Sequence, residues 1–573
     1  MSQKNVARGG GSLFADDGPD GLLHRAFLRG EGYSADDVRR APVIGIATSW
    51  SELNPCNAGL REVAAAVKRG IASRGGIGLE FPTISLSEPY SRPTSMFLRN
   101  LMSMDVEEMI ASSPVDGVVL LAGCDKTVPA QLMGAISANK PAVMVVAGPR
   151  PTSCWKNDVL TIDDVWPLID QRRLGNLDDA EWKELEGSLN TGVGSCNVLG
   201  TATTMASIAE VLGFALPGSS LLPAGSAERT AAAEAAGVAI IDVVASGMGA
   251  ANLVDERSLE NAFRLVCALG GSTNAVIHLE AIAGRAGIRL GVEKMREWAL
   301  STPLLANVRP SGRYLLADLE AAGGIPAVLG ELAGIVDLDA PTALGSPWHE
   351  SIVRSTGDRS AALSGVENPV SREGGIAILT GTLAPGGAVL KTSASDSSMR
   401  RHSGPALVFD GVDDLNARID DDELPVDENT VLILRGVGIQ GGPGMPEVGH
   451  IPIPAKLARA GVTDMMRLTD ARMSGTATGT VIVHVTPESA VGGPIGLVRD
   501  GDIVEVDVAA GRIDLLVDPE ELLRRGTVEL PPAPSRGYGW LHAQHALQPD
   551  LGCDFDFLRP DFAGRPTNGA YRD

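Results

Sequence analysis

The stretch APVIGIATS (residues 41–49) opens the alternation of segments that decides the fold. It is a short β-branched run, and LREVAAAVKRGIAS (60–73), which follows it, has the spacing of an amphipathic helix. Three further segments continue the alternation, DGVVLLAG (116–123), PAQLMGAISAN (129–139) and PAVMVVAG (141–148). This order is typical of βαβ units around a mainly parallel sheet. The uninterrupted apolar runs 118–122 and 143–147 predict strands that are buried on both faces.

Beyond these units, Ala-rich helical segments are expected at 203–212, 227–236 and 259–268, and a different pattern begins near Gly374. Short strands such as TVLILRG and TVIVHVTP now alternate with Gly, Pro and Asp turns, and residues 500–517 have the pattern of a hairpin. The Pro/Arg/Asp-rich tail after Pro531 is expected to wrap a neighbouring surface.

Chain length also indicates more than one domain, because a single hydrophobic core stops growing at roughly 250–300 residues and this chain has 573. We predict an α/β fold with two domains. Residues 1–370 form an N-terminal α/β domain with a mainly parallel sheet, and residues 371–573 form a C-terminal β-rich, barrel-like domain. The linker is expected within residues 350–375.

Charge and hydropathy exclude several classes of partner. The net charge is −23, and no cluster of Lys and Arg stands out, so neither nucleic acid nor a membrane surface is expected as a partner. No window approaches the roughly 18 uninterrupted apolar residues of a spanning helix, and the first residues lack the apolar core of a signal peptide. We therefore expect a cytoplasmic protein.

Three of the six cysteines lie in loops beside the predicted strands. Cys56, in SWSELNPCNAG, follows the first strand, and Cys124, in LLAGCDKTVP, ends a later one; open α/β sheets bind their ligands at this edge. Cys196 lies in a Gly-rich loop before a predicted helix, where backbone amides and the helix dipole favour the thiolate. These polar loop settings suit ligands, yet the residues alone leave structural thiols equally open.

The remaining cysteines have different surroundings. Cys267 lies in an apolar helical stretch, which is typical of a small buried side chain. Cys154 is next to Trp155, and Cys553 lies in the tail.

Two charged residues, Asp125 and Lys126, directly follow Cys124. Asp is a ligand for hard cations and Cys for soft ones, so the pair suggests two neighbouring metal centres, one bound through oxygen and one through sulfur. Glu88, in SLSEPYSRP, is another loop carboxylate of the same half, although a solvated surface charge is its simpler interpretation.

Two long motifs resemble the signatures of the dihydroxy-acid and phosphogluconate dehydratase family: CDKTVPAQLMG (124–134) and LTDARMSGTATG (468–479). Four shorter segments also resemble family motifs in the expected order, namely NPCN, GSCN, GTLAPGGAVLK (381–391) and GGPGMPE (441–447). The resemblance extends from about residue 15 to about residue 560.

This resemblance implies an iron–sulfur cluster, a magnesium ion and a serine base. The cluster ligands would be Cys56, Cys124 and Cys196. The Mg²⁺ ligands would be Glu88, Asp125 and Glu447, with Lys126 as a carbamate that adds a further anionic ligand. Ser474 would be the base, and Thr476 would contact the substrate. The resemblance also implies a [2Fe–2S] cluster, with [4Fe–4S] as the alternative, and a homodimer or homotetramer.

These groups suit the removal of water from a 2,3-dihydroxy acid. The C2 proton is weakly acidic, and Mg²⁺ stabilises the enediolate-like charge that develops when a base removes it. The C3 hydroxide is a poor leaving group, and an iron in a cluster with three protein thiolates keeps one position open to bind it. A serine becomes basic enough only if nearby metal charge lowers its pKa.

The expected substrate is a small polyhydroxy acid. The GTATG that contains Thr476, together with GSCNVLGTATTM (194–205), resembles the pentonate and hexonate dehydratases. We therefore expect an aldonate such as L-arabinonate, D-xylonate, D-galactonate or D-fuconate as substrate and a 2-keto-3-deoxy acid as product. The alternative is dehydration of 2,3-dihydroxyisovalerate.

Two other classes of function fit the sequence less well. Gly436, Gly438 and Gly441 match the G-x-G-x-x-G of nucleotide-binding proteins, but the prolines that follow, Pro443 and Pro446, forbid the helix that should open there. An electron-transfer protein would need a fourth cysteine ligand, for which Cys154 is the candidate. No histidine is assigned a catalytic role; His278 has the setting of a core residue, and His450 is close to Glu447 in sequence.

Overall fold

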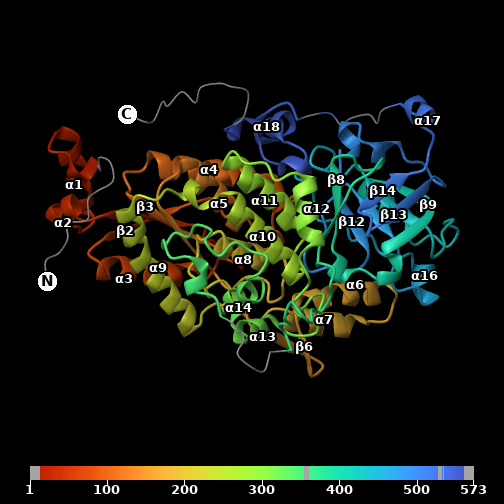
Figure 1. The fold of residues 1–573 in the computed structure, drawn as a ribbon, viewed down its shortest axis with the longest axis horizontal. Coiled ribbons are helices and arrows are strands. Elements are labelled where there is room, and N and C mark those ends of the chain that lie inside the picture. Colours follow the sequence, from red (N-terminus) through yellow and green to blue (C-terminus); the bar gives the residue numbers. More distant parts are fainter. Residues whose placement is uncertain (1–12, 354–360, 527–531, 533, 561–573) are drawn as a thin grey trace.

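The computed structural model describes residues 13–353, 361–526, 532 and 534–560. An α/β half and a barrel half lie side by side along the long axis of the molecule (Figure 1). The prediction of an α/β fold with a mainly parallel sheet and a β-rich, barrel-like second part is confirmed. Residues 354–360 of the expected linker lie outside the described residues, and the boundary between residues 370 and 371 stays a prediction.

The first half is built on a four-stranded parallel sheet in the order β2-β1-β3-β4. Its strands are β1 (Val43–Thr48), β2 (Ile77–Pro82), β3 (Gly117–Ala122) and β4 (Ala142–Val146). Every residue of β3 and β4 is buried, as their continuous apolar runs predict. The edge strand β2 is partly exposed.

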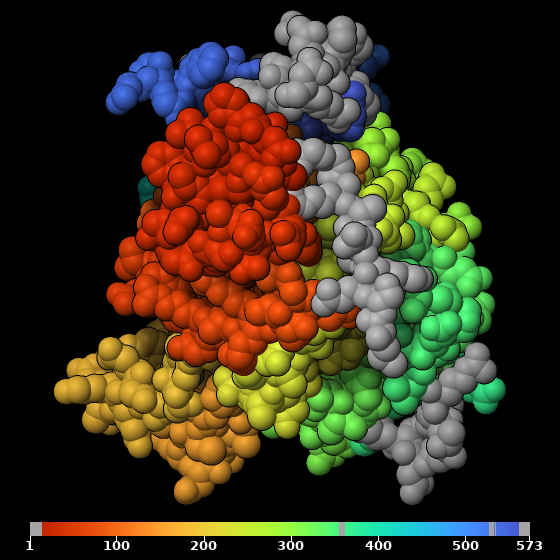
Figure 2. All heavy atoms as spheres, turned by 90° about the vertical axis from the view of Figure 1, so that its left-hand side faces the viewer, coloured from red at the N-terminus to blue at the C-terminus, as the bar shows by residue number. Residues whose placement is uncertain are grey.

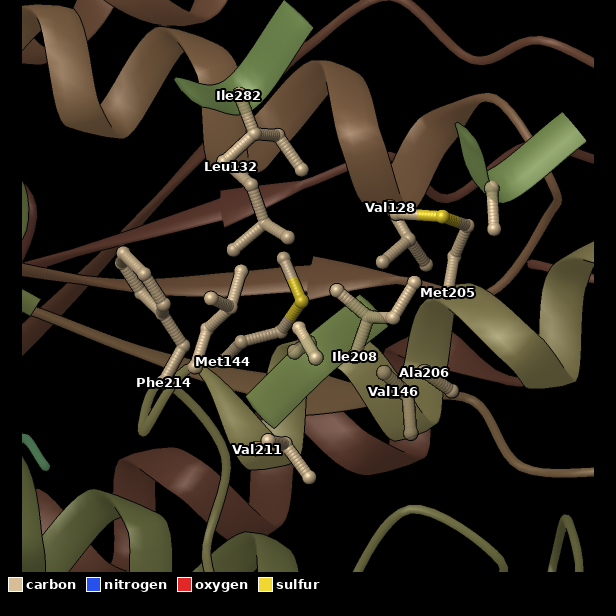
Figure 3. Close-up of a cluster of buried hydrophobic side chains, with 14 of the residues drawn as sticks. Val128, Leu132, Met144, Val146, Met205, Ala206, Ile208, Val211, Phe214 and Ile282 are labelled. Carbon is tan, nitrogen blue, oxygen red and sulfur yellow. The ribbon is translucent and has the colours of Figure 1, made fainter. Parts of the chain in front are cut away.

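Helices connect these strands and cover the sheet. The connecting helices are α3 (Leu60–Ser73), α4 (Arg99–Ser112) and α5 (Thr127–Ala138). Right-handed crossovers in this strand order place α3 on one face and α4 and α5 on the other. Two later helices, α9 (Ala227–Ser246) and α8 (Thr201–Val211), pack against α3 and α5 respectively. Figure 3 shows Val128 of α5, Val146 of β4 and Ile208 of α8 in one hydrophobic cluster.

The remaining helices of this half surround that core. They are α1 (Pro19–Gly30), α2 (Ala35–Arg40), α10 (Glu256–Leu269), α11 (Asn274–Arg285), α12 (Val292–Leu300), α13 (Leu316–Ala321) and α14 (Gly324–Glu331). Among the described residues, none of the helices has the length and apolar character needed to span a bilayer.

The second half is an eight-stranded mixed sheet in the order β14-β13-β9-β10-β11-β12-β8-β7. The strands are β7 (Ala377–Leu379), β8 (Gly387–Leu390), β9 (Arg401–Asp410), β10 (Val431–Arg435), β11 (Arg467–Thr469), β12 (Val481–Thr486), β13 (Ile503–Asp507) and β14 (Arg512–Leu515). Strands β9 to β12 are parallel, whereas β13 and β14 form the predicted antiparallel hairpin. The short helices of this half are α15 (Gly411–Arg418), α16 (Ala455–Arg459) and α17 (Pro519–Arg524).

The two ends of this sheet meet and close it into a barrel. Thr380, just after β7, forms an isolated bridge with Arg512 of β14. Its amide donates to the Gly511 carbonyl over 3.0 Å, and its carbonyl accepts from the amide of Ile513 over 3.1 Å. Because the sheet closes, neither of these two strands has a free edge along the seam. The core of this half includes an apolar cluster with Leu390, Ile433 and Val504.

An outlying segment (residues 153–188) leaves the first half and reaches the barrel. It contains β5 (Ser153–Trp155), β6 (Asp158–Leu160), α6 (Val165–Arg173) and α7 (Asp179–Ser188). Arg173 donates to the carbonyl of Ile453 over 2.8 Å and forms an ion pair with Asp420. Figure 1 shows α6 and α7 below the barrel, and the orange-gold atoms of this region project from the lower edge of the molecule in Figure 2.

The C-terminal tail (residues 534–560) folds back over the α/β half. It contains α18 (Gly537–His545), which lies at the top of Figure 1. Arg285 of α11 pairs with Asp554 over 2.6 Å, with both side chains fully buried. Arg99 of α4 donates to the carbonyls of Gly552 and Cys553. The expectation that the tail wraps a neighbouring surface is confirmed for these residues.

Helix α9 is longer than the sequence indicated, because it continues through Gly237 to Ser246. The helices α3 and α9 touch at two glycines. A Cβ on Gly70 would lie 1.9 Å from the carbonyl oxygen of Glu234, and one on Gly237 would lie 2.2 Å from that of Val67. Gly237 therefore marks a close helix contact rather than a helix end.

We predict that Gly70→Ala destabilises the protein by about 1–3 kcal/mol, because the added methyl forces the two helices apart. Gly187→Ala is the matched control, since Gly187 is also helical but no described residue outside its own helix lies within 4 Å of the added Cβ. It should be neutral or stabilising by up to about 1 kcal/mol. Chemical denaturation followed by circular dichroism measures both. An unchanged midpoint for Gly70→Ala would contradict the close contact.

Candidate active site

The loops that carry the three candidate cysteines meet at the carboxyl edge of the parallel sheet. Cys56 follows β1, and Cys124 follows β3 by two residues. The loop of Cys196 is joined to the end of β4: the amide of Ser195 donates to the Gly148 carbonyl over 2.9 Å, and the amide of Arg150 donates to Ser195 over 3.0 Å. Three separate segments are thereby brought to one place.

Small and polar residues fix the distance between the first two loops. A Cβ on Gly123 would lie 2.9 Å from the carbonyl oxygen of Cys56, so a glycine is needed for the two cysteine loops to approach. Asn57 donates to the carbonyl of Ser49 over 2.9 Å, and Asn54 donates to that of Leu86 over 2.7 Å. Both asparagines of NPCN therefore anchor the loop.

The cysteine thiols interact with one another. A hydrogen bond with Cys56, followed by burial, raises the pKa of Cys124 well above its usual value. Burial, followed by the charge of Cys56, raises the pKa of Cys196 to about 12. The loop of Cys196 leads into α8, as expected, and the effect of that helix on the thiolate stays a prediction. Cys124 is 3% exposed, and its thiol donates to Asp125 over 3.2 Å, so its setting is polar, as expected, but buried.

The other cysteines lie elsewhere. Cys267 is buried in α10, as expected, and Cys553 is buried under the tail. Cys154, the candidate fourth ligand, is exposed in β5.

The candidate magnesium ligands converge on one buried cation, the ammonium of Lys126. Its Nζ lies 2.5 Å from Asp125, 3.5 Å from Glu447 and 3.8 Å from Glu88. The Lys126 side chain is fully buried. Glu88 comes from the loop after β2 and Glu447 from the barrel half, so this group of carboxylates joins the two halves.

Electrostatics in this group favour the charged forms of Glu88 and Lys126. Burial would raise the pKa of Glu88, but Lys126, Arg472 and hydrogen bonds from Ser95 and Thr94 outweigh it and leave the pKa at about 2. Burial would lower the pKa of Lys126, but the charge of Asp125, with help from Glu447 and Glu88, raises it. For Glu447, burial prevails over Lys126 and Arg472, and its pKa is raised.

Two residues that the sequence reasoning missed hold Glu447. Arg472 is fully buried and donates to Glu447 over 2.7 Å, and its other nitrogen donates to Thr94 over 3.0 Å. Thr94 in turn donates to Glu88 over 2.7 Å. Asn274 donates to Glu447 over 2.8 Å. The signal for Arg472 was its place in the motif LTDARMSG, two residues before Ser474.

Ser474 lies next to Thr476 and near the loop of Cys196. The oxygens Ser474 Oγ and Thr476 Oγ1 are 2.9 Å apart. A Cβ on Gly200 would be 3.0 Å from Thr476 Cγ2 and 4.0 Å from the Cβ of Cys196. Asn274 donates weakly to the carbonyl of Met473 over 3.3 Å and thereby links the serine loop to Glu447. The structure thus places the candidate serine beside both groups of candidate ligands.

Among the residues that the structure describes, no three His, Cys, Asp or Glu side chains stand in the geometry of a bound metal ion. In the carboxylate group, the central position is taken by Lys126 Nζ. The donor chemistry nevertheless fits the implied groups. Three gathered thiols are soft ligands suited to iron, and three carboxylates directed at one cation are hard ligands suited to Mg²⁺.

The other candidate residues behave as the sequence indicated. His278 is fully buried in α11, and its Nδ1 lies 3.1 Å from Arg99. The glycine-rich turn at 436–441 is not followed by a helix, since the next one, α16, begins at Ala455. That turn therefore lacks the helix N-terminus that binds a dinucleotide phosphate.

Comparison with known proteins gives matches along most of the chain. The family model described as "Dihydroxy-acid/6-phosphogluconate dehydratase N-terminal" matches residues 41–351, and its C-terminal counterpart matches residues 361–553. A 6-deoxy-6-sulfo-D-gluconate dehydratase of Pseudomonas putida is 43% identical over 95% of both chains. An L-arabinonate dehydratase of Rhizobium leguminosarum is 42% identical over 94% of both chains. A dihydroxy-acid dehydratase of Solidesulfovibrio magneticus is 37% identical over 91% of this chain and 94% of its own. The chain therefore belongs to the dihydroxy-acid/6-phosphogluconate dehydratase family.

Proposed function

We propose that this protein removes water from a 2,3-dihydroxy sugar acid and releases a 2-keto-3-deoxy acid. The observation that carries the proposal is the meeting of three cysteine loops, a carboxylate group and Ser474 where the α/β half joins the barrel. Relatives at 42–43% identity that are named for sugar acids support an aldonate over the branched substrate of the 37% relative. Dehydration of 2,3-dihydroxyisovalerate is the second candidate.

The residues that would hold the cofactors are those gathered at the site. Cys56, Cys124 and Cys196 would hold the iron–sulfur cluster, for which we propose the [2Fe–2S] type. Glu88, Asp125 and Glu447 would hold Mg²⁺. When bound, the two centres supply Lewis acidity at the leaving hydroxyl and at the oxygens that gain charge when the substrate is deprotonated.

The reaction divides into steps that the protein's own residues support. Deprotonated Ser474 Oγ takes the C2 proton, the C3–O bond breaks, and the departing hydroxide takes up a proton and leaves as water, which restores the base. The enol so formed tautomerises to the keto acid. Arg472 and Asn274 hold Glu447 in place by hydrogen bonds of 2.7 and 2.8 Å. Because Asp125, Lys126 and Arg472 are buried, these charges act with little screening by water.

Lys126 must change its charge before a divalent cation binds among these carboxylates, because an ammonium and Mg²⁺ would compete for the same position. Reaction of the neutral amine with CO₂ gives a carbamate anion and releases a proton. We propose this modification for Lys126, since it converts the competing cation into a further oxygen ligand.

The substrate proposal predicts a clear order of activities. Protein purified without oxygen should release 2-keto acid from aldonates such as L-arabinonate, D-xylonate, D-galactonate or D-fuconate at least about tenfold faster, in kcat/KM, than from 2,3-dihydroxyisovalerate. A semicarbazide assay of the 2-keto product measures both. Preference for 2,3-dihydroxyisovalerate would favour the second candidate, and redox cycling without dehydration of either would contradict the enzyme class.

Replacement of the proposed base should stop the chemistry and spare the cofactors. We expect Ser474→Ala to reduce kcat by about 10²–10⁴-fold, the usual contribution of a general base. The visible absorbance and iron content should match the unmodified protein. Near-normal turnover by Ser474→Ala would show that another group removes the proton.

Replacement of a proposed cluster ligand should remove the chromophore. We expect Cys124→Ser to lose the visible iron–sulfur absorbance, because a buried serine does not replace a thiolate on iron. Cys154→Ser is the matched control, since Cys154 is exposed in β5. It should keep the full spectrum. A full-intensity spectrum for Cys124→Ser would remove that residue from the ligand set.

A further inference from the structure

A tryptophan of the outlying segment reaches the candidate base through one hydroxyl. Trp166, near the start of α6, donates its indole Nε1–H to Thr476 Oγ1 over 2.8 Å. Thr476 Oγ1 is 2.9 Å from Ser474 Oγ. The backbone amide of Thr476 also donates to Ser474 Oγ, over 3.4 Å. The outlying segment and the serine loop are thus joined beside the proposed reacting atom.

The chemistry of these groups determines which of them donates and which accepts in the chain of hydrogen bonds. An indole N–H is a donor and has no acceptor atom, so Thr476 Oγ1 must accept from Trp166. Either hydroxyl of the Thr476–Ser474 pair can donate while Ser474 keeps its proton, but a deprotonated Ser474 Oγ can only accept, and the Thr476 hydroxyl then donates to it. Ser474 Oγ then receives two hydrogen bonds, from the hydroxyl and from the amide of Thr476. Donors directed at an oxygen stabilise its deprotonated form.

Trp166 is held in this position from two sides. Its ring packs against that of His450 with centroids 5.5 Å apart. Just before α6, Asp163 and Asp164 form ion pairs with Arg309. Thr476 itself is 6% exposed, so water competes little for its hydroxyl group.

We propose that Trp166 is a positioning residue of this enzyme, and that it orients the Thr476 hydroxyl to donate to Ser474 and so stabilises the deprotonated serine. The inference rests on the proposed function, because it takes Ser474 as the base. It assigns to the outlying segment a role in catalysis that acts through Thr476.

The test is a set of variants of the complete, cofactor-loaded enzyme, assayed with the best aldonate. Trp166→Phe keeps a ring against His450 and removes the donor; we expect kcat to fall about tenfold, the worth of one hydrogen bond, with KM within about twofold. Thr476→Val should lower kcat about a hundredfold, and Thr476→Ser, which restores a hydroxyl, should recover most of that loss. The double variant Trp166→Phe/Thr476→Val should be no slower than Thr476→Val, because both changes break one chain of bonds.

A spectroscopic signature separates this role from a merely structural one. With ¹⁵N-labelled tryptophan, the indole resonance that disappears in Trp166→Phe should move in Thr476→Val, because its acceptor is lost. Trp182→Phe is the matched control, since Trp182 lies in α7 of the same segment; its kcat should not change.

The outcomes distinguish the proposed role of Trp166 from the proposed function of the enzyme. If Ser474→Ala loses kcat by the expected factor of about 10²–10⁴ while Trp166→Phe keeps the kcat of the unmodified enzyme, the proposal for Trp166 is wrong and the serine base stands. A loss of kcat in the double variant equal to the product of the two single losses would also overturn the proposed role of Trp166. If Ser474→Ala turns over normally, both the serine base and the proposed role of Trp166 are wrong.

Discussion

The buried ammonium of Lys126 is the charge on which the arrangement of the two halves depends. A charge removed from water is tolerated when opposite charges surround it, and breaking such a set is strongly destabilising. Asp125 and Glu88 come from the α/β half, and Glu447 comes from the barrel. Arg472, also from the barrel, contacts Glu447 and Thr94 and so closes the group from the other side. Separating the halves would leave buried charges without partners on both.

The tail supports the same junction from further away. Gln548 donates to Glu488 over 2.8 Å, and Glu488 accepts the backbone amides of Gln440 and Gly441 at 2.9 to 3.1 Å. These amides belong to the glycine-rich turn that leads to Glu447. A segment about a hundred residues later in the chain therefore fixes a proposed metal ligand, while Asp554 of the same segment is paired with Arg285 of the other half.

The sequence could predict what depends on local pattern, and it missed what depends on distant contacts. The buried strands β3 and β4, the β13–β14 hairpin and the position of Cys124 at a strand end follow from periodicity and the geometry of parallel sheets. Arg472 and Trp166 could not be recognised in this way, because each has a partner more than 300 residues away, Thr94 for Arg472 and Thr476 for Trp166. The same limit applies to the burial of Cys124, which a loop position in the sequence does not reveal.

Charge balance connects the ammonium seen at the site with the metal centre proposed for it. With Glu88, Asp125 and Glu447 all ionised, three negative charges face the two positive charges of Lys126 and Arg472, which leaves one net negative charge. Conversion of the ammonium to a carbamate removes two units of positive charge, and a divalent cation restores two. Carbamylation alone would leave three net negative charges, which is costly in a region of low dielectric constant, and Mg²⁺ alone would place a divalent cation beside the ammonium. Carbamylation of Lys126 and binding of Mg²⁺ are therefore expected to occur together, with the surrounding carboxylates and Arg472 serving both states.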